Sequence, residues 1–101
     1  MKSNYLLDHA GETFSTCFEL LKKKNQDYGG KDSNPFKNIE NCSTLGISPE
    51  QGLLVRMMDK ISRVSTLLEK ESEIKTESLS DTLLDLINYA AIMKAYIENK
   101  Q

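Results

Sequence analysis

The strongest structural signal in this sequence is a helix start at residues 48–51, followed by about twenty residues of helical periodicity. The Ser48 hydroxyl can cap the first turn, Pro49 suits the first helical position, and Gln51 completes a capping box. Apolar side chains then recur every three or four residues, which predicts an amphipathic helix to about Lys70. They are Leu54, Met57, Met58, Ile61, Val64 and Leu68.

Two other segments share this periodicity. One runs from about Tyr5 to Asn25 and stops before Gly29 and Gly30, which can end a helix. The other runs from about Glu77 to Glu98. Its predicted core side chains are Leu79, Leu83, Leu86, Ala90, Met93 and Ile97.

The connection between the first two long helices predicts a short linker helix. Asn34 and Pro35 resemble an N-cap followed by a proline at the first helical position. Phe36, Ile39 and Leu45 could anchor this helix, which Gly46 would end.

These segments predict an all-α fold, because no strand-like alternation appears. The expected architecture is three long helices plus the linker helix in an antiparallel bundle. A chain of 101 residues supports one core, so residues 1–101 form a single helical domain. The last helix has a second apolar flank in Leu84, Ile87 and Ala91, which predicts a homo-oligomer.

Composition excludes several classes of protein. No apolar stretch approaches the roughly 20 residues that cross a bilayer, and residues 1–4 open no signal peptide. The net charge of −2 disfavours binding to duplex nucleic acid. Cys17 and Cys42 lack metal-site spacing and are predicted to be reduced core residues, with His9 at the surface. We therefore expect a cytoplasmic protein without a membrane partner.

A polar face lies opposite the apolar stripe of the helix that starts at Ser48. Arg56, Asp59, Lys60 and Arg63 are spaced i, i+3, i+4 and i+7, so they share this face. The ordinary interpretation is a solvated face on which Asp59 relieves the repulsion between cations. The functional interpretation is a phosphate site, because arginine and lysine donate charge-assisted hydrogen bonds to phosphate oxygens.

The last helix carries a second polar face, made of Glu77, Asp81, Asp85 and Asn88. Aspartate and asparagine are unfavourable in the middle of a helix, so a compensating interaction is expected. One interpretation pairs Asp81 and Asp85 with the cations of the other polar face, within the chain or between subunits. A second is a Mg²⁺ or Mn²⁺ site, with Glu77, Asp81 and Asp85 as ligands. A third is contact with ribose hydroxyls or base donors.

Aromatic and amide side chains cluster near the end of the first helix. Tyr28 and Phe36, with amides such as Asn38, suit a nucleobase, because bases stack on aromatic rings. The alternative is that Phe36 only pins the loop to the core.

Three blocks of this sequence resemble the nucleotide-modification-associated domain family. They are Lys24-Asn25-Gln26-Asp27-Tyr28-Gly29, Arg56-Met57-Met58-Asp59-Lys60-Ile61-Ser62-Arg63, and the run from Glu77 to Tyr89. The resemblance covers roughly residues 15–97 and implies a small all-α phage protein of nucleotide metabolism. We count Asp27 and Tyr89, which lie in these blocks, among the ligand-binding candidates.

The block Asp81/Asp85/Asn88/Tyr89 also resembles the last metal helix of MazG-like and dimeric dUTPase-like nucleotide pyrophosphohydrolases. Such an enzyme would use Mg²⁺ to hold the phosphates and activate water. The resemblance implies an acidic pair on each of two helices, yet the helix containing Asp59 offers three cations around that single carboxylate. This departure favours nucleotide binding over catalysis.

Two functional hypotheses result. The first is a phage-type sponge without a cofactor, which sequesters a phosphorylated nucleotide inside an infected or host bacterial cell and does not cleave it. It is similar in outline to phage proteins that capture cyclic nucleotides or ADP-ribose derivatives from the defence systems CBASS and Thoeris. The alternative is a Mg²⁺-dependent nucleotide pyrophosphohydrolase. A third interpretation makes both polar faces a charge-paired interface between subunits.

Overall fold

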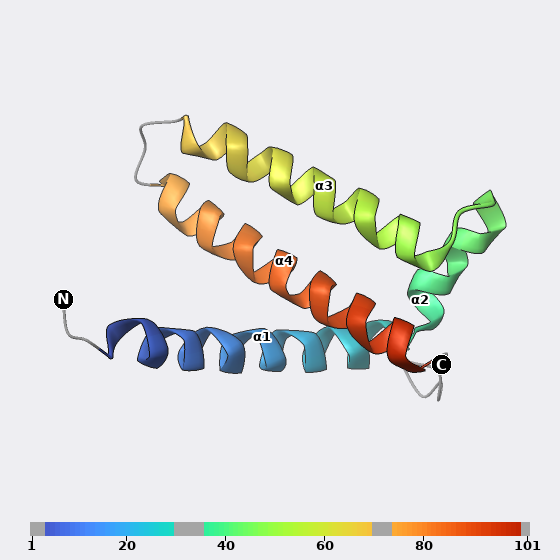
Figure 1. Cartoon of the computed structure of the whole chain (residues 1–101), viewed down its shortest axis with the longest axis horizontal. Helices are drawn as coiled ribbons and strands as arrows, with labels where there is room; N and C mark the ends of the chain where they lie inside the picture. Colours follow the sequence, from blue (N-terminus) through green and yellow to red (C-terminus); the bar gives the residue numbers. More distant parts are fainter. Residues whose placement is uncertain (1–3, 30–35, 70–73, 100–101) are drawn as a thin grey trace.

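The computed structural model describes residues 4–29, 36–69 and 74–99, and within them every regular element is helical (Figure 1). The helices are α1 (Tyr5–Gly29), α2 (Lys37–Glu40), the 3₁₀ segment η1 (Asn41–Leu45), α3 (Pro49–Leu68) and α4 (Ile74–Asn99). The prediction of an all-α fold with three long helices and a short linker helix is confirmed for this part of the chain.

The start of α3 has the predicted capping box. Ser48 Oγ accepts a hydrogen bond from the backbone N–H of Gln51 at 3.1 Å, and the Ser48 N–H donates to Gln51 Oε1, also at 3.1 Å. Pro49 occupies the first turn, where its missing N–H costs nothing. Local side-chain chemistry therefore fixes where α3 begins.

Two helix boundaries differ from the prediction. α1 continues past Asn25 to Gly29, because residues 26–28 contain neither proline nor glycine to stop it. α4 begins at Ile74, three residues before Glu77, and ends at Asn99. Both long helices are therefore longer than their apolar periodicity alone indicated.

The linker folds as α2 followed by η1. Gly46 ends this segment in a left-handed conformation with φ of 75°, as predicted. Ile39 is buried, but Leu45 is 78% exposed, so the prediction that Leu45 anchors the linker is wrong. The change from α to 3₁₀ geometry at Asn41 moves later side chains out of the α-helical register. The predicted cap at residues 34–35 lies outside the described residues.

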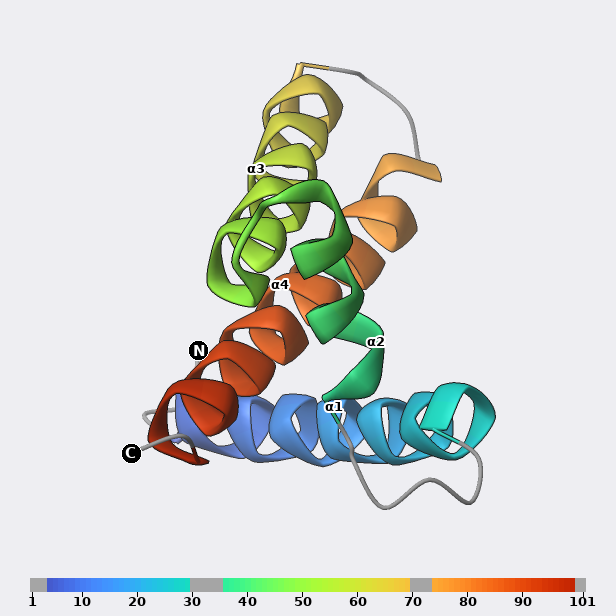
Figure 2. The same cartoon turned by 90° about the vertical axis from the view of Figure 1, so that its right-hand side faces the viewer.

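α4 is the central helix of the molecule. α3 lies beside α4 and runs in the opposite direction, and α1 crosses α4 on another side (Figures 1 and 2). The backbones of α1 and α3 do not approach each other in the described part of the chain. α2 packs against both α1 and α3. Any side-chain substitution at Gly52 would collide with Cys42, so this glycine permits η1 to lie close to α3.

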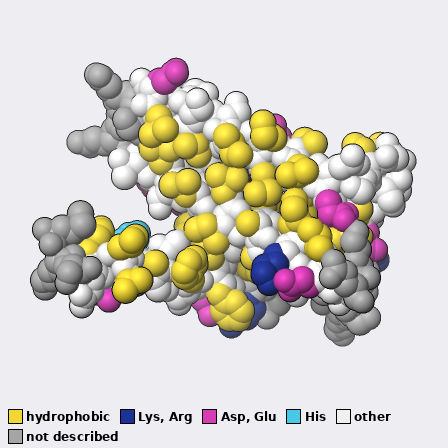
Figure 3. Space-filling model, in the orientation of Figure 1, with side chains coloured by type: hydrophobic (Ala, Val, Ile, Leu, Met, Phe, Trp, Pro, Cys, Tyr) yellow, Lys and Arg dark blue, Asp and Glu magenta, His cyan; other side chains and the backbone are white. Residues whose placement is uncertain are grey.

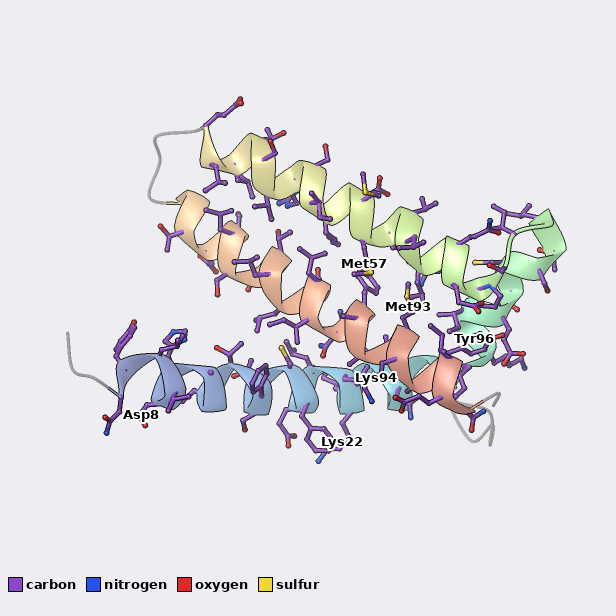
Figure 4. The ribbon with its side chains drawn as sticks, in the orientation of Figure 1. Asp8, Lys22, Met57, Met93, Lys94 and Tyr96 are labelled. Atoms are coloured by element: carbon purple, nitrogen blue, oxygen red, sulfur yellow. The ribbon has the colours of Figure 1, made fainter. Side chains whose placement is uncertain are left out.

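The buried core is small. Its buried apolar members among the described residues are Cys17, Ile39 and Leu53, and the polar Thr82 and Asn88 are buried with them. Met57 of α3 and Met93 of α4 extend into the space between their helices (Figure 4). The predicted core role of Cys17 is confirmed, whereas Cys42 is half-buried.

α3 is rotated relative to the prediction. Of its apolar stripe, Met57 and Val64 are half-buried, but Leu54, Met58 and Ile61 are 51%, 61% and 49% exposed. The buried side chain of α3 is instead Leu53, which is 1% exposed. The prediction that the whole stripe faces the core of this chain is therefore wrong.

α4 also departs from its predicted orientation. Leu83 is 48% exposed and Ala90 is exposed, whereas Asn88, predicted to lie opposite the core, is 7% exposed. The physical reason is that α4 is covered on two sides, by α3 and by α1. A single apolar stripe does not describe a helix with two neighbours.

A large apolar surface remains exposed. The accessible area is 7841 Å², compared with about 5,800 Å² for a typical folded monomer of this mass. Apolar side chains extend across the visible face of α3 and α4 and continue onto α1 (Figure 3). Within the described residues, no helix is long and apolar enough to span a membrane.

Candidate functional site

The polar face predicted on α3 lies beside α4 in this structure and meets one residue of the predicted α4 polar face, Asp85. Arg56, Asp59, Lys60 and Arg63 of α3 and Tyr89 of α4 line an open hollow of about 340 Å³. The i, i+3, i+4, i+7 spacing puts the four α3 residues on one face, and the packing of α3 on α4 brings Tyr89 beside them. The sequence alone left open whether these faces share a pocket.

Exposure divides this hollow into a wall and a rim. Arg56 and Lys60 are half-buried between the helices, whereas Asp59 and Arg63 are exposed. Three cations and one carboxylate leave the α3 side of the hollow with a net positive charge. Guanidinium groups in such a position can bind an anion through two parallel hydrogen bonds.

Asp85 joins three helices next to the hollow. Its Oδ2 lies 3.1 Å from Lys60 Nζ of α3, and its Oδ1 lies 3.5 Å from Lys24 Nζ of α1. The Asp85 side chain is 28% exposed, so these ion pairs are partly shielded from water. This geometry matches the charge-pairing interpretation of Asp85 and holds the Lys60 ammonium at the inner edge of the hollow.

The other residues of the α4 polar face separate. Asn88 is buried, but Asp81 and Glu77 are exposed. Thr82, one turn before Asp85, is buried and donates its hydroxyl to the Ser78 carbonyl at 2.7 Å. The structure therefore brings Asp85 and Tyr89 to the cationic face and leaves Glu77 and Asp81 on the surface.

The predicted metal ligands do not gather into a ligand set. Within the described residues, no three histidine, cysteine, aspartate or glutamate side chains are grouped so that they could hold a metal ion. Both carboxylate oxygens of Asp85 face lysines. A divalent cation next to Asp85 would have to displace these ammonium groups, so we derive no step through a metal.

The predicted base-stacking residues lie elsewhere or are not described. The ring of Phe36 packs edge-on against Tyr96 of α4, with 5.4 Å between ring centroids. Tyr96 is seven residues beyond Tyr89, about 10 Å along the helix, so Phe36 pins the linker to α4 at a distance from the hollow. The side chains of Asp27, Tyr28 and Asn38 lie outside the described part of the structure.

Two neighbours of the site were not predicted from the sequence, Lys24 and Cys17. Cys17 Sγ donates to the Leu84 carbonyl at 3.8 Å. Burial raises the pKa of the Cys17 thiol, and the negative charge of Asp85 raises that pKa further. Lys24 opens one of the blocks that carry the family resemblance, but no periodicity indicates that α1 crosses α4 at Asp85.

A second, larger hollow of about 510 Å³ lies along α1 between Ser15 and Lys23. All of its lining residues belong to α1, so it has no wall from a second element. Because an enclosing wall is what removes a ligand from water, we place the candidate site at the smaller hollow between α3 and α4.

No family model, curated protein or solved structure matches this chain.

Proposed function

We propose that this protein binds a small phosphorylated nucleotide at the hollow between α3 and α4. The observation that carries the proposal is the presence of Arg56, Lys60 and Arg63 on one side of a hollow that also contains Tyr89. Phosphate groups require several charge-assisted donors, and a nucleoside offers a ring that can stack on tyrosine. Both requirements are met within one pocket.

Each residue has a distinct role in this proposal. Arg56, half-buried, binds phosphate oxygens at the wall, and the exposed Arg63 closes on the ligand from the rim. Lys60 is positioned by Asp85, which competes with the phosphate for the same ammonium group. Tyr89 provides the aromatic surface. Asp59 orients a neighbouring guanidinium group or accepts a ribose hydroxyl.

More specifically, we propose that the protein is a phage-type sponge. It is a homo-oligomer that sequesters a nucleotide immune signal without cleaving it. It is supported by the small helical chain, by the predominance of cations over carboxylates in the pocket, and by the pairing of Asp85 with two lysines. Cyclic nucleotides and ADP-ribose derivatives both combine phosphates with a base, as the pocket requires.

The test is recovery of an intact ligand. The purified protein is incubated with nucleoside triphosphates, cyclic oligonucleotides and ADP-ribose derivatives, with and without Mg²⁺, and then denatured by heat. Mass spectrometry identifies what is released. We expect one ligand class to disappear from solution and return unchanged, and capture of no nucleotide by the folded protein would contradict the proposal.

The same experiment tests the alternative enzyme. Release of a monophosphate plus pyrophosphate only in the presence of Mg²⁺ would favour a nucleotide pyrophosphohydrolase. In that case Asp85→Asn should abolish turnover at saturating Mg²⁺, because an amide is a poorer ligand than a carboxylate.

A further inference from the structure

Four side chains of the apolar stripe of α3 are exposed in the described part of this chain. Leu54, Met58, Ile61 and Leu68 are 51%, 61%, 49% and 62% exposed. They lie about 80° to 160° around the helix from Lys60, which pairs with Asp85 of α4. An exposed row of large side chains at this spacing is typical of a helix that packs on another helix.

α4 continues the same surface. Leu83 is 48% exposed and lies about 120° around α4 from Tyr89, which lies beside α3 in the hollow. Because α3 and α4 run in opposite directions, equal rotations away from their facing residues bring side chains to the same side of the pair. Leu83 and the α3 stripe therefore form one surface, the apolar face, which Figure 3 shows as a band across both helices. By the same geometry, Arg63 and Asp59 lie on the opposite side.

We infer that the apolar face is covered by the same face of a second copy of this chain. The two α3–α4 pairs would then form a four-helix bundle, in which like surfaces pack about a two-fold axis. The total accessible area of the chain exceeds that of a typical monomer by about 2,000 Å². An obligate homodimer buries at least about 1,000 Å² per subunit, so the chain exposes enough surface for such an interface. This dimer specifies the homo-oligomer of the proposed function, and its formation does not require the nucleotide.

Charge distinguishes a second copy from a lipid surface. On α3 the apolar face carries no charged residue between Leu54 and Leu68; Ser65 lies within it, and Ser62 and Glu69 border it. On α4, Lys94 lies about 20° around the helix from Leu83 and pairs with Glu98 at 2.7 Å. Helices that lie on membranes place lysine and arginine beside their apolar side. The three cations of α3 instead line the hollow with Tyr89. The α3 part of the face therefore has an uncharged centre and a polar border, as is typical of a homodimer interface.

The first test is the mass of the unmodified protein in solution. Sedimentation equilibrium at several concentrations should give at least twice the chain mass of 11.4 kDa. Ile61→Lys should lower this mass to that of one chain. Thr66→Lys, which adds the same charge at an exposed position about 140° around α3 from Ile61, should not. A folded wild-type protein that is monomeric at every concentration would overturn the inference. Co-sedimentation of that monomer with vesicles of anionic phospholipid would then assign the apolar face to a lipid surface.

A second test needs no variant and therefore no assumption about folding. Within one chain Met58 is more exposed than Met57, so peroxide should oxidise Met58 faster. If a second copy covers the apolar face, Met58 is oxidised no faster than Met57, as peptide mass spectrometry can measure. Oxidation of Met58 several-fold faster than Met57 in the concentrated native protein would contradict the inference.

Discussion

The two flanks of α3 differ in what they contact. One flank carries Arg56, Lys60 and Arg63 and lies beside Tyr89 and Asp85 of α4. The other carries Leu54, Met58 and Ile61 and faces outward. A helix that folded only to hide its own apolar side chains would show the reverse arrangement.

A helix can be oriented by the contacts of its polar side chains as well as by the burial of its apolar ones. Turning the polar flank toward α4 gives Lys60 a carboxylate and encloses a hollow. Exposure of the apolar flank is unfavourable by roughly 25 cal/mol for each Å² left in water. A second copy of the chain would remove that cost, and the site would remain on the other side of the helix pair.

The largest effect is expected from Leu53→Ala. Leu53 is 1% exposed, so its truncation should lower the free energy of unfolding by about 2–5 kcal/mol. Urea denaturation measures this effect. The matched control is Leu54→Ala at the adjacent, exposed position, which should weaken self-association more than it destabilises the chain. The comparison is made at concentrations low enough for the protein to be monomeric. If Leu53→Ala and Leu54→Ala then lower the free energy of unfolding equally, the two positions do not differ in the way described.

Arg63→Ala tests the polar flank. Loss of a guanidinium that binds phosphate should weaken nucleotide binding by roughly tenfold to a hundredfold, and stability should change little because Arg63 is exposed. Isothermal titration calorimetry with the ligand recovered by mass spectrometry measures the affinity. Lys22→Ala removes a cation on the side of α1 that faces away from α4 (Figure 4) and should leave binding unchanged. Unchanged affinity in Arg63→Ala would exclude Arg63 from the site.

Asp85→Asn should have a smaller effect on stability. Its two ion pairs join α1, α3 and α4, and partly exposed pairs of this kind each contribute up to about 1 kcal/mol. The loss should shrink at high salt, which screens exposed charges. Glu98→Gln is the control, because Glu98 pairs with Lys94 one turn away in the same helix. An identical response of both variants at low and high salt would show that Asp85 does not join the helices.

The smallest expected effect is the pH dependence due to Cys17. Its pKa is raised in the folded protein by burial, and next by Asp85. The native state therefore holds the thiol proton more tightly than the unfolded chain does. This stability is present below the ordinary thiol pKa of about 8.5 and is lost as the pH rises through the folded value. Urea denaturation across this range should show the decline in wild type and not in Cys17→Ala. A decline of the same size in Cys17→Ala would assign it to other groups.

Local features of the fold could be predicted from the sequence. The Ser48–Gln51 capping box, the Gly46 stop and the helical periodicity depend on neighbouring residues and are visible in the chain. The rotation of α3 could not be predicted, because periodicity defines which residues share a face and not which face another helix covers. An oligomer interface and an internal core produce the same apolar stripe.

The candidate site was predictable in composition but not in position. The spacing of Arg56, Lys60 and Arg63 places them on one face, and Asp85 stands out as an aspartate in the middle of a helix. The contributions of Lys24 and Cys17 depend on where α1 crosses α4. Phe36 was predicted either to stack on a base or to pin the linker, and its contact with Tyr96 matches the second role.

The most direct test of the account is an isotope-filtered NOE experiment on an equal mixture of labelled and unlabelled protein, because it detects only contacts between chains. We predict intermolecular NOEs from the Ile61 and Leu54 methyl groups and none from the Arg56 or Arg63 side chains. Intermolecular NOEs confined to the arginine flank, with none from Ile61 or Leu54, would contradict the claim that α3 turns its polar flank to its own site and its apolar flank to a second copy.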